Sequence, residues 1–321
     1  MQVFQLTLER MLMMFLLITV GILLRKTHIL PEDSHVVLAK METYVFVPAL
    51  VLHTQMTRCT VAAFTQHYGL MFYGLAIALC CMALSYPVAK LFIPHAPTPD
   101  RLYQRRVYQY AMTFSNFGFM GNFIILGIWG RDMFYLYGLF VLLYNILCNS
   151  WGLYILIPRE RGVSLAANLR RGLLSPPIVA TLTGMVMGLM DLSRFVPAFC
   201  LSALENASAC QGPVAMLLAG VVIGGYDFKA LFTDRKVYIA SLVRLILIPA
   251  AAVLAIRCLG ASETLQILAL IAFGTPLGLN TIVFPAAYGG DPRTGASMTM
   301  VSHTLSVATI PLMYLLLIEL L

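Results

Sequence analysis

The sequence predicts an all-α membrane protein with ten transmembrane helices, and composition is the first observation behind that prediction. Of the 321 residues, 60% are hydrophobic and 11% are charged, and the mean hydropathy is +0.84. A soluble domain needs many more charged residues on its surface. Several apolar stretches reach the about 20 residues that a spanning helix requires. Short segments of alternating polarity, which are typical of membrane barrels, do not recur.

Apolar runs and helix-breaking residues define the individual elements. The ten predicted spans lie near residues 5–24, 36–56, 67–91, 107–129, 133–157, 174–192, 197–224, 236–257, 264–288 and 293–319. The first run lacks a basic leader and a cleavage site, so it is interpreted as a spanning helix. The seventh span is the least regular, because Glu205, Asn206 and Gly212 interrupt it.

Loop charges predict the orientation of these spans. Most of the 21 Lys and Arg residues lie in or beside the loops that follow odd-numbered spans. The positive-inside rule places those loops in the cytoplasm and both termini on the outer side of a plasma (cell inner) membrane. The net charge of +7 is then explained by these loops, without nucleic acid as a partner.

The basic stretch 158–172 is predicted to be a cytoplasmic linker that divides the chain into two halves. Residues 1–157 and 173–321 each hold five predicted spans, and an odd number of spans inverts the second half. Two short similarities support a duplication: WGRD at 129–132 resembles YGGD at 288–291, and Pro48 and Pro213 are at a similar offset. These features predict two inverted five-helix repeats.

Predicted spans four and nine contain residues that weaken a helix in mid-membrane. Interruption there frees backbone N–H and C=O groups, and the N-terminus of a half-helix attracts anions. Alternatively, the glycines permit close helix packing and the asparagines bond between helices; two such segments at matching positions favour a functional site. The residues expected to shape the two breaks are Gly118, Gly121, Pro276 and Gly278, and those expected to bind substrate are Asn116, Asn122, Asn280 and Thr281.

Three further polar groups lie deep in apolar runs. Arg244 sits in the middle of span eight, where a charge costs about 2.5–3.5 kcal/mol. It is expected either to hold an anionic substrate or to pair with Glu205 or with backbone carbonyls. Tyr144–Asn145 in span five and His303 in span ten are at matching offsets, and they either line the cavity or bond between helices. His53 and Gln55 are weaker candidates.

Other chemistries find no support in the sequence. HExxH, P-loop and GxSxG patterns do not occur, so no enzyme is predicted. The seven cysteines are scattered through apolar runs without a CxxC pair, which indicates packing rather than a disulfide framework or a metal site. No cofactor is predicted, and coupling to protons, to sodium or to neither stays open.

Several short motifs, taken in order, resemble the auxin efflux carrier family. They extend over essentially the whole chain and comprise residues 46–50 (FVPAL), 116–118 (NFG), 144–145 (YN), 151–152 (WG), 276–278 (PLG), 283–284 (VF), 288–291 (YGGD), 304–306 (TLS) and 310–312 (IPL). One departure is Gly121-Asn122-Phe123, where family members commonly carry a proline. Asparagine keeps the backbone N–H and adds an amide that could contact substrate.

The resemblance implies ten helices in two inverted repeats, with crossed broken helices four and nine as in bile-acid sodium symporter-like transporters. Helices 1, 2, 6 and 7 would form a scaffold, and helices 3, 4, 5, 8, 9 and 10 a transport domain that moves in an elevator-like manner. A homodimer through the scaffold is implied. Plant members export indole-3-acetate and microbial relatives are linked to malate and malonate, so the implied function is secondary transport of a small organic anion.

Two other functions fit the same pattern. A membrane-embedded sensor or receptor would bind a ligand in the same fold without moving it. A structural subunit of a larger complex would not need paired helix breaks, which disfavours that reading.

Overall fold

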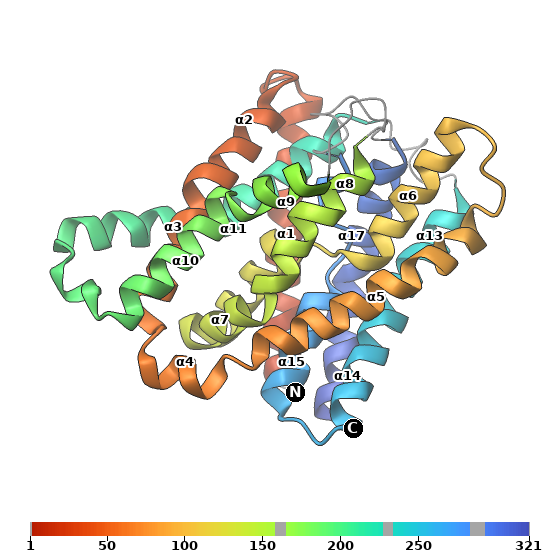
Figure 1. The fold of residues 1–321 in the computed structure, drawn as a ribbon. Helices are drawn as coiled ribbons and strands as arrows, with labels where there is room; N and C mark the ends of the chain where they lie inside the picture. Colours follow the sequence, from red (N-terminus) through yellow and green to blue (C-terminus); the bar gives the residue numbers. More distant parts are fainter. Residues whose placement is uncertain (1, 158–164, 227–233, 283–292, 321) are drawn as a thin grey trace.

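The computed structural model describes residues 2–157, 165–226, 234–282 and 293–320. Within these residues every regular element is helical, which confirms the all-α class (Figure 1). Elements labelled η are π-helical, except the 3₁₀ helix η5. The first half contains α1 (Gln2–Lys26), α2 (Ser34–Met41), η1 (Glu42–Phe46), α3 (Val47–Arg58), α4 (Val61–His67), α5 (Leu70–Phe92), α6 (Pro99–Thr113), η2 (Phe117–Gly121), α7 (Asn122–Leu147), η3 (Cys148–Gly152) and α8 (Leu153–Leu156). The second half contains α9 (Leu165–Leu173), α10 (Pro176–Leu189), η5 (Leu192–Phe195), α11 (Ala198–Gly224), α13 (Arg235–Leu242), η6 (Val243–Leu247), α14 (Ile248–Cys258), α15 (Glu263–Gly274), α17 (Arg293–Tyr314) and η7 (Leu315–Glu319).

Seven helical stretches in the described residues are long and apolar enough to cross a membrane. They are Phe4–Lys26, Ser34–Arg58, Val61–Phe92, Phe117–Leu156, Ala198–Gly224, Arg235–Cys258 and Arg293–Glu319. The chain is therefore a multi-pass membrane protein, whereas the count of ten spans stays a prediction.

The difference between seven and ten has local causes. The stretch Phe117–Leu156 joins parts of the predicted fourth and fifth spans, although Gly130 interrupts its helical backbone with φ 75° and ψ −167°. The predicted sixth and ninth spans correspond to the shorter apolar helices α10 and α15. The part of the predicted ninth span after Ile282 lies outside the described residues.

Proline explains two of the π-helical turns. Pro48 follows η1 by two residues, and Pro249 stands in the same relation to η6. Proline has no N–H to donate and its ring clashes with the carbonyl four residues earlier. A widened turn before each proline relieves that clash, which keeps the helix continuous.

Close helix contacts depend on small residues. A side chain at Gly21 would collide with the carbonyl of Leu217, and one at Gly220 with the carbonyl of Ile18, so α1 and α11 pack backbone to backbone. Helices α1, α3, α10 and α11 contact one another in a chain of neighbours, while α5 contacts α6 and α7, and α14 contacts α15. Figure 1 shows α3, α10 and α11 extending to one side and α5, α13 and α14 on the other.

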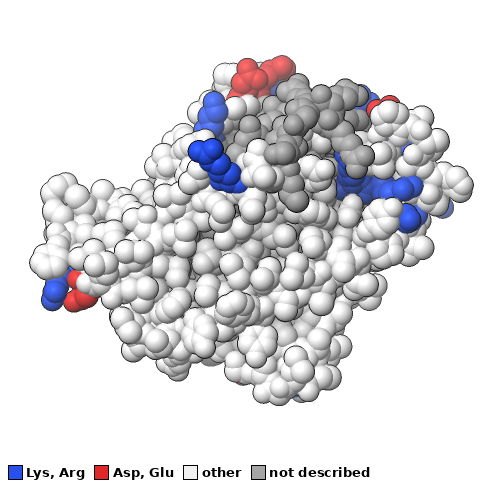
Figure 2. Space-filling model, viewed as in Figure 1, with Lys and Arg blue, Asp and Glu red and all other residues white. Residues whose placement is uncertain are grey.

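Charge is distributed unevenly along the molecule. In Figure 1 both termini lie at the lower end. In the same view, Figure 2 shows Lys and Arg side chains mostly at the upper end, with a large uncharged surface below them. Large apolar side chains such as Leu91, Phe199 and Leu259 are exposed, as expected for surfaces that face lipid.

Candidate functional site

Helical structure is interrupted at two places that lie far apart in the sequence. Helix α6 ends at Thr113, Phe114 is extended, and helix resumes with η2. Helix α15 ends at Gly274, Thr275 is extended, and helix resumes at Asn280. Each interruption therefore presents the N-terminus of a new helical segment, whose first N–H groups have no partner within that helix.

The two interrupted segments contact each other directly. Ser115 and Leu277 form an antiparallel bridge, and the backbone N–H of Asn116 donates to the carbonyl of Pro276 at 2.7 Å. The Ser115 hydroxyl donates to the carbonyl of Ala272 in the last turn of α15. A side chain at Gly278 would come within 3.0 Å of the Ser115 carbonyl, so glycine permits this close approach.

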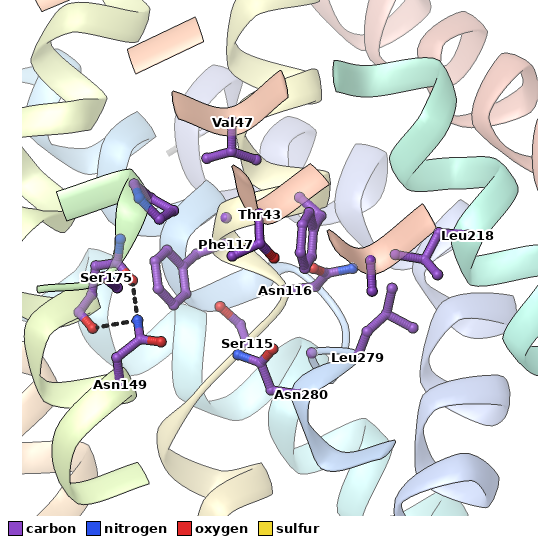
Figure 3. A pocket seen from close by; sticks show the side chains of 16 residues that line it. Thr43, Val47, Ser115, Asn116, Phe117, Asn149, Ser175, Leu218, Leu279 and Asn280 are labelled. Atoms are coloured by element: carbon purple, nitrogen blue, oxygen red, sulfur yellow. Dashed lines mark hydrogen bonds between the residues drawn. The ribbon is translucent and has the colours of Figure 1, made fainter. Parts of the chain in front are cut away.

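A cavity of about 160 Å³ borders this meeting point. Figure 3 shows Thr43 and Val47 on one side of the cavity, Ser115 and Asn280 on the opposite side, and Asn116 between them. None of the described side chains that line it is charged. The lining residues are Ala39, Thr43, Val47, Ser115, Asn116, Phe117, Gly118, Phe119, Asn145, Asn149, Ser175, Pro177, Leu218, Gly278, Leu279 and Asn280.

A second, larger cavity has a different character. It has a volume of about 340 Å³ and lies between α5 and α14. Its lining is almost wholly apolar, with residues such as Ile77, Leu84 and Ala252. It offers few groups that would orient a polar solute, so the smaller, polar cavity is the candidate site.

The Asn116 amide is held by His303. Its Nδ2 atom lies 3.2 Å from Nε2 of His303, and Nδ1 of His303 lies 2.8 Å from the carbonyl of Thr299. A carbonyl only accepts, so Nδ1 carries the proton and Nε2 of the neutral ring accepts from Asn116. His303 thus orients Asn116 from behind and does not line the cavity.

Three more amides are fixed around the cavity. Nδ2 of Asn149 donates to the side-chain oxygen of Asn145 at 2.7 Å and to its backbone carbonyl at 3.0 Å, as the dashed lines in Figure 3 show. Nδ2 of Asn280 donates to the sulfur of Cys148 at 3.8 Å. Together with Asn116, these amides supply both donors and acceptors to a bound solute.

Tyr144 and Arg244 lie at the end of α6 and outside the cavity lining. The Tyr144 hydroxyl donates to the carbonyl of Thr113 at 2.8 Å and accepts from the N–H of Ser115 at 3.2 Å. Nη1 of Arg244 lies 3.4 Å from the carbonyl of Met112 and 3.5 Å from that of Thr113. Both side chains satisfy carbonyls that α6 leaves open at its C-terminus.

Of the two structural partners predicted for Arg244, the structure brings only the carbonyls to it. Glu205 is exposed and pairs with Arg131 at 3.4 Å, and His53 also bonds to Arg131, at 2.9 Å. Because Glu205 is exposed and pairs with Arg131, it is not a partner of the buried Arg244. The expectation of a Glu205–Arg244 pair is therefore wrong.

Of the remaining predicted residues, Gly118 lines the cavity, whereas Gly121, Asn122 and Thr281 lie at the breaks outside its lining. Asn122 is buried at the start of α7, and the Thr281 hydroxyl donates to the carbonyl of Gly278 at 2.9 Å. A side chain at Gly121 would collide with the hydroxyl of Tyr137, whereas one at Gly118 would meet nothing within 4 Å. The motifs at 283–284 and 288–291 lie outside the described residues.

Several lining residues were missed by sequence reasoning. Asn149 follows Asn145 by one helical turn within an apolar run, which is a signal that the sequence contains. Thr43 and Ser175 lie in the predicted second and sixth spans and had no such signal. Among the described residues, no group of three or more His, Cys, Asp and Glu side chains could hold a metal ion.

Interrupted helices that meet at a polar cavity are a feature of many secondary transporters. The chain matches the family of membrane transport proteins over residues 6–314. It therefore belongs to this family, which includes the auxin efflux carriers, and the resemblance found in the sequence is confirmed. No curated protein matches the chain. The protein is a membrane transporter, and its family is not an enzyme family.

Proposed function

We propose that this protein is a secondary transporter of a small organic anion, with a carboxylate as its charged group, in the plasma membrane. The observation that carries the proposal is that two helix N-termini border one polar cavity. Phe117, Gly118 and Phe119 begin the helical segment after the first break, and Asn280 begins the one after the second, with Leu279 directly before it. All five residues line the cavity.

Helix N-termini supply positive potential without a charged side chain. The first N–H groups of a helix have no intrahelical acceptor, and the helix dipole adds about half a positive charge at this end. Carboxylates bind readily at such positions. Two N-termini, with the amides of Asn116 and Asn280 beside them, favour an anion even though no described lining side chain is a cation.

The size of the cavity supports a small solute. Its volume of about 160 Å³ is below the about 300–1,000 Å³ of pockets that hold drug-sized ligands.

Arg244 acts in this proposal as a fixed structural cation at the end of α6, and not as a ligand of the substrate. We infer this role from its two carbonyl neighbours.

The proposed architecture has ten spans in two inverted repeats with crossed broken helices four and nine. The scaffold would comprise α1, the α2–α3 unit, α10 and α11, and the other helices would form the transport domain. The cavity supports an elevator-like motion because it lies between these groups. Ala39, Thr43 and Leu218 line it from the scaffold side, and Asn116 and Asn280 from the other.

The proposed orientation places both termini outside and the basic end in the cytoplasm. The separation of the termini from most Lys and Arg side chains in Figures 1 and 2 supports it. A homodimer through the scaffold helices completes the proposal, and chemical cross-linking in native membranes tests it.

Uptake by proteoliposomes tests the transport proposal. Purified protein is reconstituted and offered radiolabelled malate, malonate and indole-3-acetate, with and without proton and sodium gradients. Accumulation above that of protein-free liposomes is expected for at least one acid. The alternative, a membrane-embedded sensor, predicts saturable binding of an acid, measured by the fluorescence of Trp151 in η3, without uptake of any of them.

A further inference from the structure

The Glu42 carboxyl group is buried inside a membrane-spanning helical stretch. Glu42 is the first residue of η1, within the stretch Ser34–Arg58, and its side chain is 0% exposed. Neither carboxylate oxygen has a hydrogen-bond partner in the described part of the chain. A carboxyl group in this position is rare in membrane helices and indicates a function unless a partner explains it.

One polar side chain faces this carboxyl group. Gln211 of α11 lies beside Glu42 and is 1% exposed, and its Nε2 atom has no hydrogen-bond partner among the described residues. Both groups therefore carry unused hydrogen-bonding capacity in the same buried place. A neutral amide beside the carboxyl group does not offset a negative charge.

No cation compensates Glu42 in the described structure. Helices α2, α3, α10 and α11 pack against η1. Their ionisable groups, with that of η1 itself, are His35, Lys40, Tyr44, His53, Arg58, Cys200, Glu205 and Cys210. None of these groups forms an ion pair or hydrogen bond with Glu42 in the described structure. Lys40 is exposed, Arg58 pairs with Asp132, and Glu205 pairs with Arg131.

Burial without a cation favours the neutral form of the carboxyl group. An ionised carboxylate that leaves water for an apolar interior loses several kcal/mol of hydration, which only a nearby positive charge or several hydrogen bonds restores. A protonated carboxyl group avoids that loss. Its carbonyl oxygen is still able to accept from Nε2 of Gln211, which has no other partner among the described residues.

Glu42 is also adjacent to the wall of the candidate site. Ala39, Thr43 and Val47 follow one face of the same helical stretch and line the cavity. Any movement that hydrates this wall brings water within one residue of the carboxyl group. Its proton then has an acceptor, and the resulting carboxylate is solvated.

We propose that Glu42 is a proton-binding site, protonated in the conformation described here and releasing its proton to water when the neighbouring cavity wall becomes hydrated. Proton occupancy and conformation are then thermodynamically linked. The coupling of this linkage to solute movement rests on the proposed transport function, whereas the protonation of Glu42 itself does not.

Infrared spectroscopy of the reconstituted full chain in D₂O at pH 7 tests the protonation. Exposed Asp and Glu side chains, with ordinary pKa values near 4, are ionised at this pH and give no carboxylic-acid carbonyl band. The wild type is expected to show such a band, Glu42→Gln to lose the contribution of one carboxyl group, and Glu32→Gln, at an exposed site between α1 and α2, to retain it. A band that is absent from the wild type or undiminished in Glu42→Gln would overturn the proposal.

Folding of the variant is informative as well. Glutamine is the neutral isostere of protonated glutamate, so Glu42→Gln is expected to reach the membrane and melt close to the wild type. Failure of this variant to fold, with Glu32→Gln intact, would contradict a neutral Glu42.

The link to transport has its own readout. Initial uptake by the wild type is expected to change with the imposed proton gradient, and uptake by Glu42→Gln to be independent of it. If no acid is taken up by the wild type while the infrared band is present, the proposed transport function fails and the proton site stands. If uptake depends on sodium and is equally pH-independent in both proteins, the linkage is wrong.

Discussion

At the scale of single residues, Arg244 shows how a buried charge is accommodated without a carboxylate. Its side chain is 1% exposed, and its guanidinium group faces the last carbonyls of α6. The C-terminal end of a helix carries partial negative charge. Because α6 ends in the middle of the protein, this negative end is buried beside the guanidinium group, whose Nε and Nη2 atoms have no hydrogen-bond partner among the described residues.

Replacement of Arg244 by methionine tests this role. Methionine fills a similar volume but leaves the end of α6 without a cation, and we expect a loss of about 1–2 kcal/mol of stability. Thermal melting of the purified protein measures it, with the exposed Arg194→Met as control. If melting stays unchanged while the affinity for the solute collapses, Arg244 belongs to the substrate site instead.

At the scale of elements, two glycines of the interrupted segments have different tasks. A methyl group at Gly278 would press on the Ser115 carbonyl at 3.0 Å, whereas one at Gly118 would project into open space at the cavity. Gly278 therefore permits the close approach of the two segments, and Gly118 leaves space in the cavity.

The two alanine variants are expected to separate these tasks. Gly278→Ala should lower the melting temperature, because the bridge between Ser115 and Leu277 has to widen. Gly118→Ala should melt like the wild type and bind the solute more weakly, because its methyl group occupies part of the cavity. Equal melting of both variants would show that the segments are not in close contact.

Gly130 ends one helical segment and allows the next to begin. Its φ of 75° and ψ of −167° belong to a region that is open almost only to glycine, and a side chain there costs about 1–3 kcal/mol. Gly130→Ala should therefore be destabilised by about that amount. Gly69→Ala serves as control, because its methyl group would meet nothing within 4 Å and its φ is −59°. Chemical denaturation in detergent micelles compares the two, and equal stability would refute a strained turn at 130.

At the scale of the whole molecule, the proposed orientation predicts which loops face the outside. Single cysteines at Glu263 and Asp100, both exposed, are introduced into a variant without the seven native cysteines. A membrane-impermeant maleimide should label Glu263→Cys in intact cells and Asp100→Cys only after permeabilisation. The reverse pattern would place the termini in the cytoplasm.

The all-helical membrane architecture was predictable because helices that span a bilayer need long runs of apolar residues. Apolar runs identified most of the helices, and the glycines and Pro276 marked the segments in which helix is interrupted. Contacts between segments that are far apart in the sequence were harder to predict from residue types and spacing. The carbonyl partners of Arg244 could not be predicted from the sequence, because every residue has a backbone carbonyl. Glu205, as a carboxylate, was the more obvious partner. Thr43 and Ser175 became part of the site only through the packing of other helices around it.

The central claim is that a small anion binds in the cavity where the two interrupted helices meet. Uptake by proteoliposomes that contain Asn116→Ala and Asn280→Ala together tests it most directly, with Asn206→Ala, exposed on α11, as the matched control. Each lost hydrogen bond costs about 0.5–1.5 kcal/mol, so the double variant should transport about 5-fold to 150-fold more slowly at low solute concentration while the control keeps the wild-type rate. Uptake by a well-folded double variant at the wild-type rate would contradict this account.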